Sequence, residues 1–199
     1  MKRRSFLASG LKSAAAIFPA TVLADLALAQ SPAASPNDVH VVAAGNDRLG
    51  EHRSRGFSTV LFKVLPEETN SGLFVIEHQN LIKGGPPLHY HIAQEEYFYV
   101  LEGEVIFQVG DIRKKLVAGE SVVGPRGVPH AFSGSDSKPG RMLIAFTPAG
   151  KMEPFLRVST APNPPAWTAE FFRQHDMVLV GPRPFCSRFP RSHRSGATQ

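Results

Sequence analysis

The stretch HYHIAQEE, residues 89–96, decides the fold of this 199-residue chain, together with GPRGVPHAF at residues 124–132. Side chains alternate between the two faces of a β-strand, so His89 and His91 point to the same face. Glu96 adds a carboxylate and His130 a third imidazole. These ligands suit a divalent first-row transition metal, and on an octahedral ion they leave two positions for water, dioxygen or substrate. We therefore predict a metal site formed by His89, His91, Glu96 and His130.

The donor set does not select one metal, because iron, manganese, nickel, copper, cobalt and zinc all accept imidazole and carboxylate ligands. The other five histidines have no partner ligands near them in the sequence, and we expect them to be ordinary core or surface residues. They are His40, His52, His78, His175 and His193.

The spacing of the first stretch resembles the first motif of the cupin superfamily: a glycine, five residues, H-x-H, three or four residues, a glutamate, six residues and a glycine. His89, His91, Glu96 and Gly103 match this spacing, and Gly84 stands one residue closer than the pattern asks. The six-residue gap to Gly103 selects the second of two adjacent glutamates.

The second stretch resembles the second cupin motif, a glycine, five residues, P-x-G, two residues, a histidine, three residues and an asparagine. Gly119, Pro125, Gly127 and His130 match it, and Gly134 replaces the closing asparagine. Fifteen residues, 104–118, separate the motifs and leave room for a hairpin.

Glu95 competes with Glu96 for the ligand position, because a three-residue gap after His91 would select Glu95. Strand alternation places Glu96, Phe98 and Val100 on one face and Glu95 on the other. We therefore prefer Glu96. We also expect Phe98, Val100 and Phe132 to line the barrel lumen, as a substrate pocket wall or as ordinary core.

The resemblance implies an all-β fold, a single cupin jelly-roll barrel, with a short helical C-terminal extension. Alternating apolar runs separated by Gly, Pro, Asn and Asp agree with many short strands. These runs cover residues 57–65, 72–81, 95–109, 113–119, 121–125 and 141–148. Gly110 and Asp111 suggest a tight hairpin turn, and residues 132–137 read as a polar turn.

The predicted domains are a cupin domain over residues 45–150 and a C-terminal arm over residues 151–182. Residues 155–158 suit either a last strand or a short helix. A helix is expected over residues 168–174, with Thr168 as its N-cap. The arm is expected to pack over one barrel end or to act as a lid.

The first 29 residues have a basic start, an apolar middle and small residues near Ala29, which is typical of a signal peptide. Arg3 and Arg4 resemble a twin-arginine export signal. We predict cleavage after Ala29, a periplasmic protein without a stable membrane anchor, and a linker over residues 30–44. Cys186, the single cysteine, gives no intramolecular disulfide.

The formal net charge of +5 is concentrated at the two ends of the chain. Residues 183–199 contain four arginines and no acid, whereas residues 30–182 contain 14 basic and 16 acidic residues. The basic tail is expected to be a solvated, disordered segment, and no nucleic-acid partner is predicted.

The chain resembles quercetin dioxygenase-like cupins most. This resemblance implies an oxygen-dependent dioxygenase acting on a phenolic or flavonol-like small molecule, with Glu96 as the general base, and a homodimer. Two alternatives remain: a metal-dependent isomerase or lyase acting on a small metabolite, and a cupin that binds a small ligand without catalysis.

Overall fold

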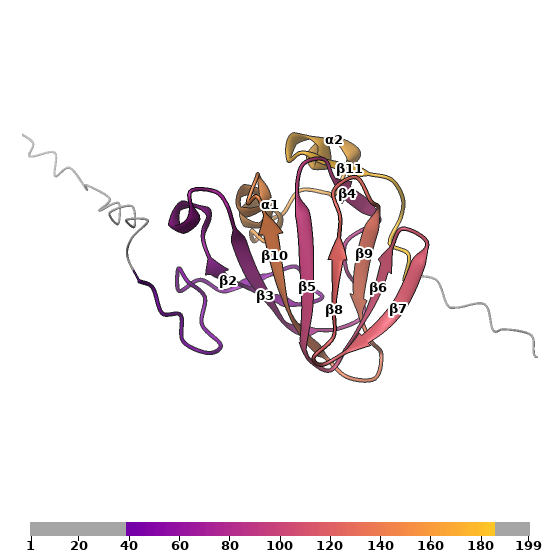
Figure 1. Cartoon of the computed structure of the whole chain (residues 1–199), viewed down its shortest axis with the longest axis horizontal. Coiled ribbons are helices and arrows are strands. Elements are labelled where there is room, and N and C mark those ends of the chain that lie inside the picture. Colours follow the sequence, from indigo (N-terminus) through magenta and orange to yellow (C-terminus); the bar gives the residue numbers. More distant parts are fainter. Residues whose placement is uncertain (1–38, 186–199) are drawn as a thin grey trace, which may run out of the picture. The chain divides into compact units, whose positions relative to one another are not determined.

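The computed structural model of the chain describes residues 39–185. The predicted signal peptide, most of the predicted linker, Cys186 and residues 186–199 of the basic tail lie outside this range. Figure 1 shows two antiparallel sheets packed face to face, with short helices at one end. The predicted all-β jelly roll with a helical C-terminal extension is confirmed.

The larger sheet has six strands in the order β1-β2-β3-β10-β5-β8. Strands far apart in the sequence lie next to each other, since β10 pairs with both β3 and β5. A short 3-10 helix, η1 (Pro66–Thr69), links β2 to β3. The strands are β1 (Arg53–Ser54), β2 (Thr59–Val64), β3 (Phe74–Leu81), β5 (Glu95–Glu102), β8 (Ser121–Gly124) and β10 (Gly140–Thr147).

The smaller sheet has five strands in the order β11-β4-β9-β6-β7. The hairpin predicted between the two motifs is present, because β6 pairs with β7 and Val109 lies opposite Ile112. Gly110 has φ +56°, which suits a tight turn. The strands are β4 (His89–His91), β6 (Glu104–Val109), β7 (Ile112–Val117), β9 (His130–Gly134) and β11 (Met177–Leu179).

The core lies between the two sheets and is rich in phenylalanine. In β5 the side chains of Glu96, Phe98 and Val100 are buried, and the residues between them are more exposed. Burying a large apolar side chain contributes roughly 1.5–3 kcal/mol. Tyr97 and Tyr99 lie half-buried on the opposite face of β5, which points away from the core. The described residues form only the two sheets given above, so no third sheet covers this face.

Residues 132–137 differ from the predicted polar turn. Residues 132–134 belong to β9 and are buried, and only residues 136–138 form a bend. The buried Ser133 hydroxyl donates to the Gly134 carbonyl and accepts from the Gly84 amide at 3.1 Å. Its polar group is therefore satisfied inside the strand, which a sequence pattern does not reveal.

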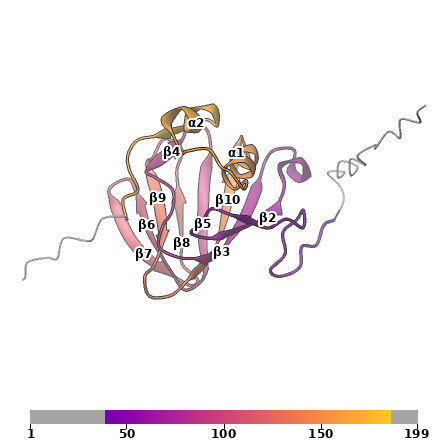
Figure 2. The same ribbon diagram turned by 180° about the vertical axis from the view of Figure 1, so that it is seen from behind.

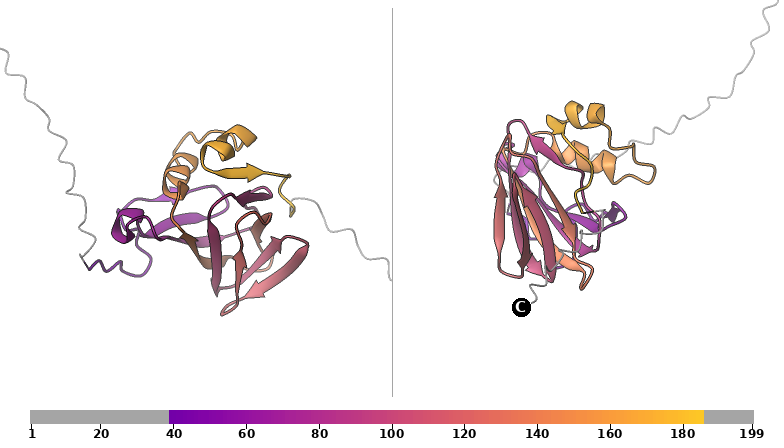
Figure 3. Two further views of the ribbon diagram at one scale, coloured as in Figure 1. Left: turned by 45° about the horizontal axis from the view of Figure 1, so that its top comes forward. Right: turned by 90° about the vertical axis from the view of Figure 1, so that its right-hand side faces the viewer.

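The C-terminal arm closes one end of the barrel with two helices, α1 (Met152–Ser159) and α2 (Ala169–Gln174). Both lie over the same barrel end when the molecule is seen from the front and from behind (Figure 2), and side by side in Figure 3. Residues 155–158 are therefore helical. Thr168 caps α2 as predicted, since its side chain accepts a hydrogen bond from the Phe171 amide.

Part of this arm belongs to the barrel. Strand β11 pairs with β4, and Met177 lies opposite His91. The range 151–182, expected as an arm outside the barrel, thus contributes a strand beside the predicted ligands. Within residues 39–185, no helix is long and apolar enough to span a bilayer.

Candidate metal centre

Three neighbouring strands bring the four predicted ligands together. The short strand β4 presents His89 and His91 on its buried face, one residue apart. His89 lies opposite His130 of β9, and Glu96 enters from β5 in the facing sheet. One ligand atom from each of the four residues lies within 4.8 Å of the others, and all four side chains are buried.

Each histidine is oriented through its Nδ1 atom. The Nδ1–H of His89 donates to the Pro87 carbonyl at 2.9 Å, and that of His130 donates to the Val128 carbonyl at 2.9 Å. His91 Nδ1 lies 3.2 Å from the Gln94 side-chain oxygen. These contacts leave Nε2 of each ring for the centre of the cluster, the arrangement usual for imidazole ligands.

Gln94 links the cluster to the loop after β10. Its amide nitrogen donates to the carbonyls of Pro148 at 2.8 Å and Ala149 at 2.6 Å. Because the nitrogen is committed to two carbonyls, the amide oxygen is the acceptor for His91. No role for Gln94 is predicted from the sequence, since the loop carbonyls that hold its amide lie more than 50 residues away.

The centre holds more acceptors than donors. With Nδ1 protonated, a neutral imidazole presents only a lone pair at Nε2. The Nε2 atoms of His91 and His130 nevertheless lie 3.0 and 2.8 Å from the same Glu96 carboxylate oxygen. Such convergence requires a positive charge, either a proton or a metal cation. The residues present therefore fit a divalent metal, as the donor set predicts.

The pKa shifts of the metal-free cluster agree with a positive charge between Glu96 and the histidines. Burial alone raises the pKa of the Glu96 carboxyl, but hydrogen bonds from His130 and His91 outweigh it and hold the pKa far below its usual range. Burial lowers the pKa of His130, but its bond to Glu96 raises the pKa overall. Burial, reinforced by the two neighbouring histidines, lowers the pKa of His89 to about 3.

Glu95 lies outside the cluster. It faces outward on β5 and forms an ion pair with Arg126, whose Nη2 lies 2.7 Å from a Glu95 oxygen. The alternation that selected Glu96 over Glu95 therefore holds in the structure.

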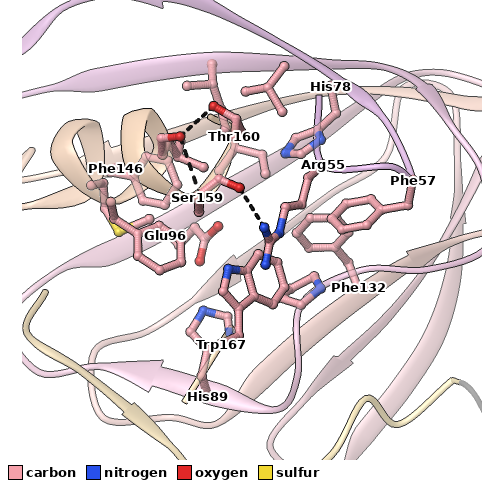
Figure 4. Close-up of a pocket in the computed structure, with 17 residues that line it drawn as sticks. Arg55, Phe57, His78, His89, Glu96, Phe132, Phe146, Ser159, Thr160 and Trp167 are labelled. Atoms are coloured by element: carbon pink, nitrogen blue, oxygen red, sulfur yellow. Dashed lines mark hydrogen bonds between the residues drawn. The ribbon is translucent and has the colours of Figure 1, made fainter. Parts of the chain in front are cut away.

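A cavity of about 50 Å³ lies beside the cluster and is mostly apolar (Figure 4). Glu96 and His89 are the two predicted ligands on its wall. Of the three predicted lumen residues, Phe132 lines the cavity, whereas Phe98 and Val100 do not and belong to the packed core.

His78 is a second buried histidine on the cavity wall, although the sequence predicts an ordinary core or surface residue there. Its Nδ1 lies 2.6 Å from the Ser58 hydroxyl. Burial lowers its pKa to about 4, against a smaller opposing effect of Glu96. His78 is therefore neutral at pH 7 and separate from the four ligands.

The chain is similar to several known proteins. "Tetracenomycin polyketide synthase protein TcmJ" of Streptomyces glaucescens is 25% identical over 114 residues, which cover 57% of this chain and 75% of that protein. An RmlC-like cupin from Shewanella frigidimarina has 21% identity and a TM-score of 0.49, covering 58% of this chain and 96% of its own.

The polyketide cyclase RemF from Streptomyces resistomycificus has 24% identity and a TM-score of 0.41, covering 46% of this chain and 66% of its own. Residues 78–146 match the family model described as the cupin domain. The matched range contains all four predicted ligands and lies within the two packed sheets. The match to this family model, over strands of both packed sheets, supports a cupin domain over residues 78–146.

Proposed function

We propose that this chain is a metal-dependent enzyme that acts on a phenolic or enolisable small molecule in an oxygen-dependent reaction, as quercetin dioxygenase-like cupins do. One observation carries the proposal: the ligand cluster opens onto an apolar cavity through Glu96 and His89. A cluster that only stabilised the fold would need no opening toward such a space.

His89, His91, Glu96 and His130 would hold the metal, which when bound supplies Lewis-acid activation of a substrate oxygen. The Glu96 carboxylate borders the cavity and can accept the proton of a substrate hydroxyl. The apolar wall formed by Phe132, Ile144 and Phe146 excludes bulk water from that proton transfer.

The substrate class has support from the relative in Streptomyces glaucescens, whose name assigns it to a polyketide synthase. Polyketides carry closely spaced carbonyl groups and therefore enolise readily. A phenolic or enolisable substrate for this chain is consistent with that chemistry.

A redox-neutral lyase or isomerase is the second candidate. The wall near the cluster carries Arg55, His78, Ser159 and Thr160, which provide the charged and hydroxylated groups that such a reaction needs. The cavity of about 50 Å³ also suits a small metabolite better than a whole flavonol.

Metal analysis of the natively purified protein, followed by oxygen-uptake assays with flavonols, catechols and enediols, tests the proposal. We expect bound metal and substrate-dependent oxygen uptake, which Glu96→Gln abolishes and the matched Glu95→Gln retains. Turnover of a substrate without oxygen uptake would favour the redox-neutral candidate. A protein that takes up no metal after reconstitution would overturn both.

Ligand binding without turnover in the metal-loaded protein, unchanged by Glu96→Gln, would instead indicate a non-catalytic binding cupin. We also propose that the protein is exported to the periplasm and forms a homodimer. Light scattering and N-terminal sequencing of the secreted protein test these two points.

A further inference from the structure

Arg55 and Trp167 line the cavity and are called here its mouth, and a second arginine, Arg183, lies beside Trp167. The Arg55 guanidinium carbon lies 4.3 Å from the Trp167 ring centroid, and that of Arg183 lies 5.6 Å from it. Arg55 donates only to backbone carbonyls, those of Ser159 at 2.8 Å and Pro165 at 3.5 Å. Among residues 39–185, no carboxylate lies within ion-pair distance of Arg55 or Arg183.

This pairing of cations is unfavourable in the absence of an anion. Burial lowers the pKa of Arg55, and the charge of Arg183 lowers it further. Most other arginines of the described range pair with a carboxylate, as Arg53 does with Asp47 and Arg141 with Glu77. A guanidinium held at a cavity wall without a counter-ion is suited to a carboxylate, which it can bind through two parallel hydrogen bonds.

Trp167 supplies a further free donor. Its indole Nε1 is buried and has no hydrogen-bond partner within the described part of the chain. A buried donor without a partner costs about 1–3 kcal/mol. Arg55 and Trp167 line the same cavity as Glu96 and His89 (Figure 4). A ligand in this cavity can therefore contact Arg55 and Trp167 as well as the two predicted metal ligands.

Trp167 also lines a larger outer pocket of about 590 Å³, together with Pro87, Leu179, Gly181, Pro182 and Arg183. The indole sits on the loop of residues 160–168 between α1 and α2. An aromatic ring needs more room than the inner cavity of about 50 Å³ gives, so this loop would have to move toward the outer pocket when such a ligand binds.

We propose that Arg55 and Trp167 bind the carboxylate of a hydroxyaryl carboxylic acid whose hydroxyl group faces Glu96. The placement of the hydroxyl group at Glu96 depends on the proposed function. The placement of the carboxylate depends only on the contacts of Arg55 and Trp167. Arg55 and the indole N–H provide the donors, and the apolar wall accepts the ring.

The chain contains a single tryptophan, so its fluorescence reports on this mouth directly. We would titrate the full chain with 6-hydroxy-2-naphthoate, whose hydroxyl and carboxylate lie at opposite ends of the ring system, and with 2-naphthol, which lacks the carboxylate. Both titrations would be made on the protein as purified and again after chelation of metal. Calorimetry would give the same affinities without an optical signal.

We expect the acid to quench the fluorescence and to bind at least about tenfold more tightly than the naphthol, because charge-assisted hydrogen bonds are strong. Arg55→Gln should remove this preference and leave the affinity for 2-naphthol unchanged. Arg55→Lys should retain part of it. Arg173→Gln is the matched control, since it removes the same charge from an exposed ion pair on α2.

Equal binding of the two probes, or binding of neither, would overturn the inference. So would a preference that survives Arg55→Gln but vanishes on chelation, because the carboxylate would then bind to the metal. If Arg55→Gln does not fold, the Arg55→Lys variant and the comparison of the two probes on the unmodified chain decide whether Arg55 binds the carboxylate. Failure of oxygen uptake with intact carboxylate preference would reject the proposed function and retain this subsite.

Discussion

The ligand cluster and the cavity mouth border the same cavity but are built in opposite ways. The cluster stands on three strands, and each histidine Nδ1 has an acceptor. The mouth stands on a strand end and a loop, where the Arg55 guanidinium has no carboxylate partner within the described residues and the Trp167 N–H has no acceptor there. A saturated, strand-borne site suits one small ion in fixed geometry.

This difference indicates that the cluster binds an ion and the mouth binds an exchanging ligand. Donors without partners on a loop are suited to a ligand that arrives and leaves, because the ligand completes their hydrogen bonds. Changes in the cluster should therefore affect metal content and stability, and changes in the mouth should affect local motion and ligand choice.

The largest effect is expected from His130→Ala, which removes one of four ligands. If binding energies of structural metal sites, about 10–16 kcal/mol, divide evenly over four ligands, the metal affinity falls roughly several hundredfold. Elemental analysis and chelator competition measure it. His52→Ala is the control, since His52 is exposed and outside the cluster. Retention of metal by His130→Ala would show that the cluster is not the site.

Acidification should destabilise the metal-free protein through His78. Its pKa is about 4 in the fold against 6.5 ordinarily, so between these values the unfolded chain binds more protons. The stability from neutral His78 is complete above pH 6.5 and falls by roughly 3 kcal/mol as the pH drops to 4. Urea unfolding with a chelator, at pH 7 and 4.5, measures this.

The double variant Ser58→Ala/His78→Phe removes the titrating group and its hydroxyl partner together. We expect its stability to fall less than that of the unmodified protein over the same pH interval. Identical pH profiles would show that His78 protonates without cost inside the fold.

Gln94→Leu should weaken metal binding by about 10–100-fold, because partners of this kind orient the ligand and fix its tautomer. Gln94→Glu retains an acceptor for His91 but loses both donors to the loop after β10, so we expect an intermediate loss. Gln108→Leu, on β6 and outside the cluster, is the matched control. Unchanged affinity in Gln94→Leu would mean that strand geometry alone orients His91.

The ligand set could be predicted from the sequence because it depends on short spacings. Two histidines one residue apart must share a strand face, and alternation along β5 separates Glu96 from Glu95. The apolar runs indicated most strands for the same reason. The ligand spacing and the alternation along each strand are local properties, which a single sequence displays.

The groups around the ligands could not be predicted, because they meet only in the folded chain. Gln94 contacts a loop more than 50 residues away, and Arg55 reaches Ser159 across 104 residues. The end of β9 was predicted to be a turn because serine and glycine usually favour turns. At Gly134, however, an added Cβ would lie 2.5 Å from the Leu81 carbonyl oxygen, so close packing requires glycine there.

The smallest effect is expected at the mouth, from loss of the Arg55 contacts with the loop of residues 160–168. Arg55→Gln removes the hydrogen bonds to the Ser159 carbonyl at the end of α1 and to the Pro165 carbonyl of the loop, and it removes the stacking on Trp167. The Thr168 amide, which donates to the Ala166 carbonyl within the loop, and the Ala161 amide, which donates to the Val158 carbonyl of α1, should then exchange a few-fold faster, about the effect of one hydrogen bond. Hydrogen exchange followed by mass spectrometry measures this, and amides of β4 and β9 serve as the internal reference. Equal acceleration in those strands would mean that Arg55 supports the whole barrel, and the contrast between a fixed cluster and an adaptable mouth would fail.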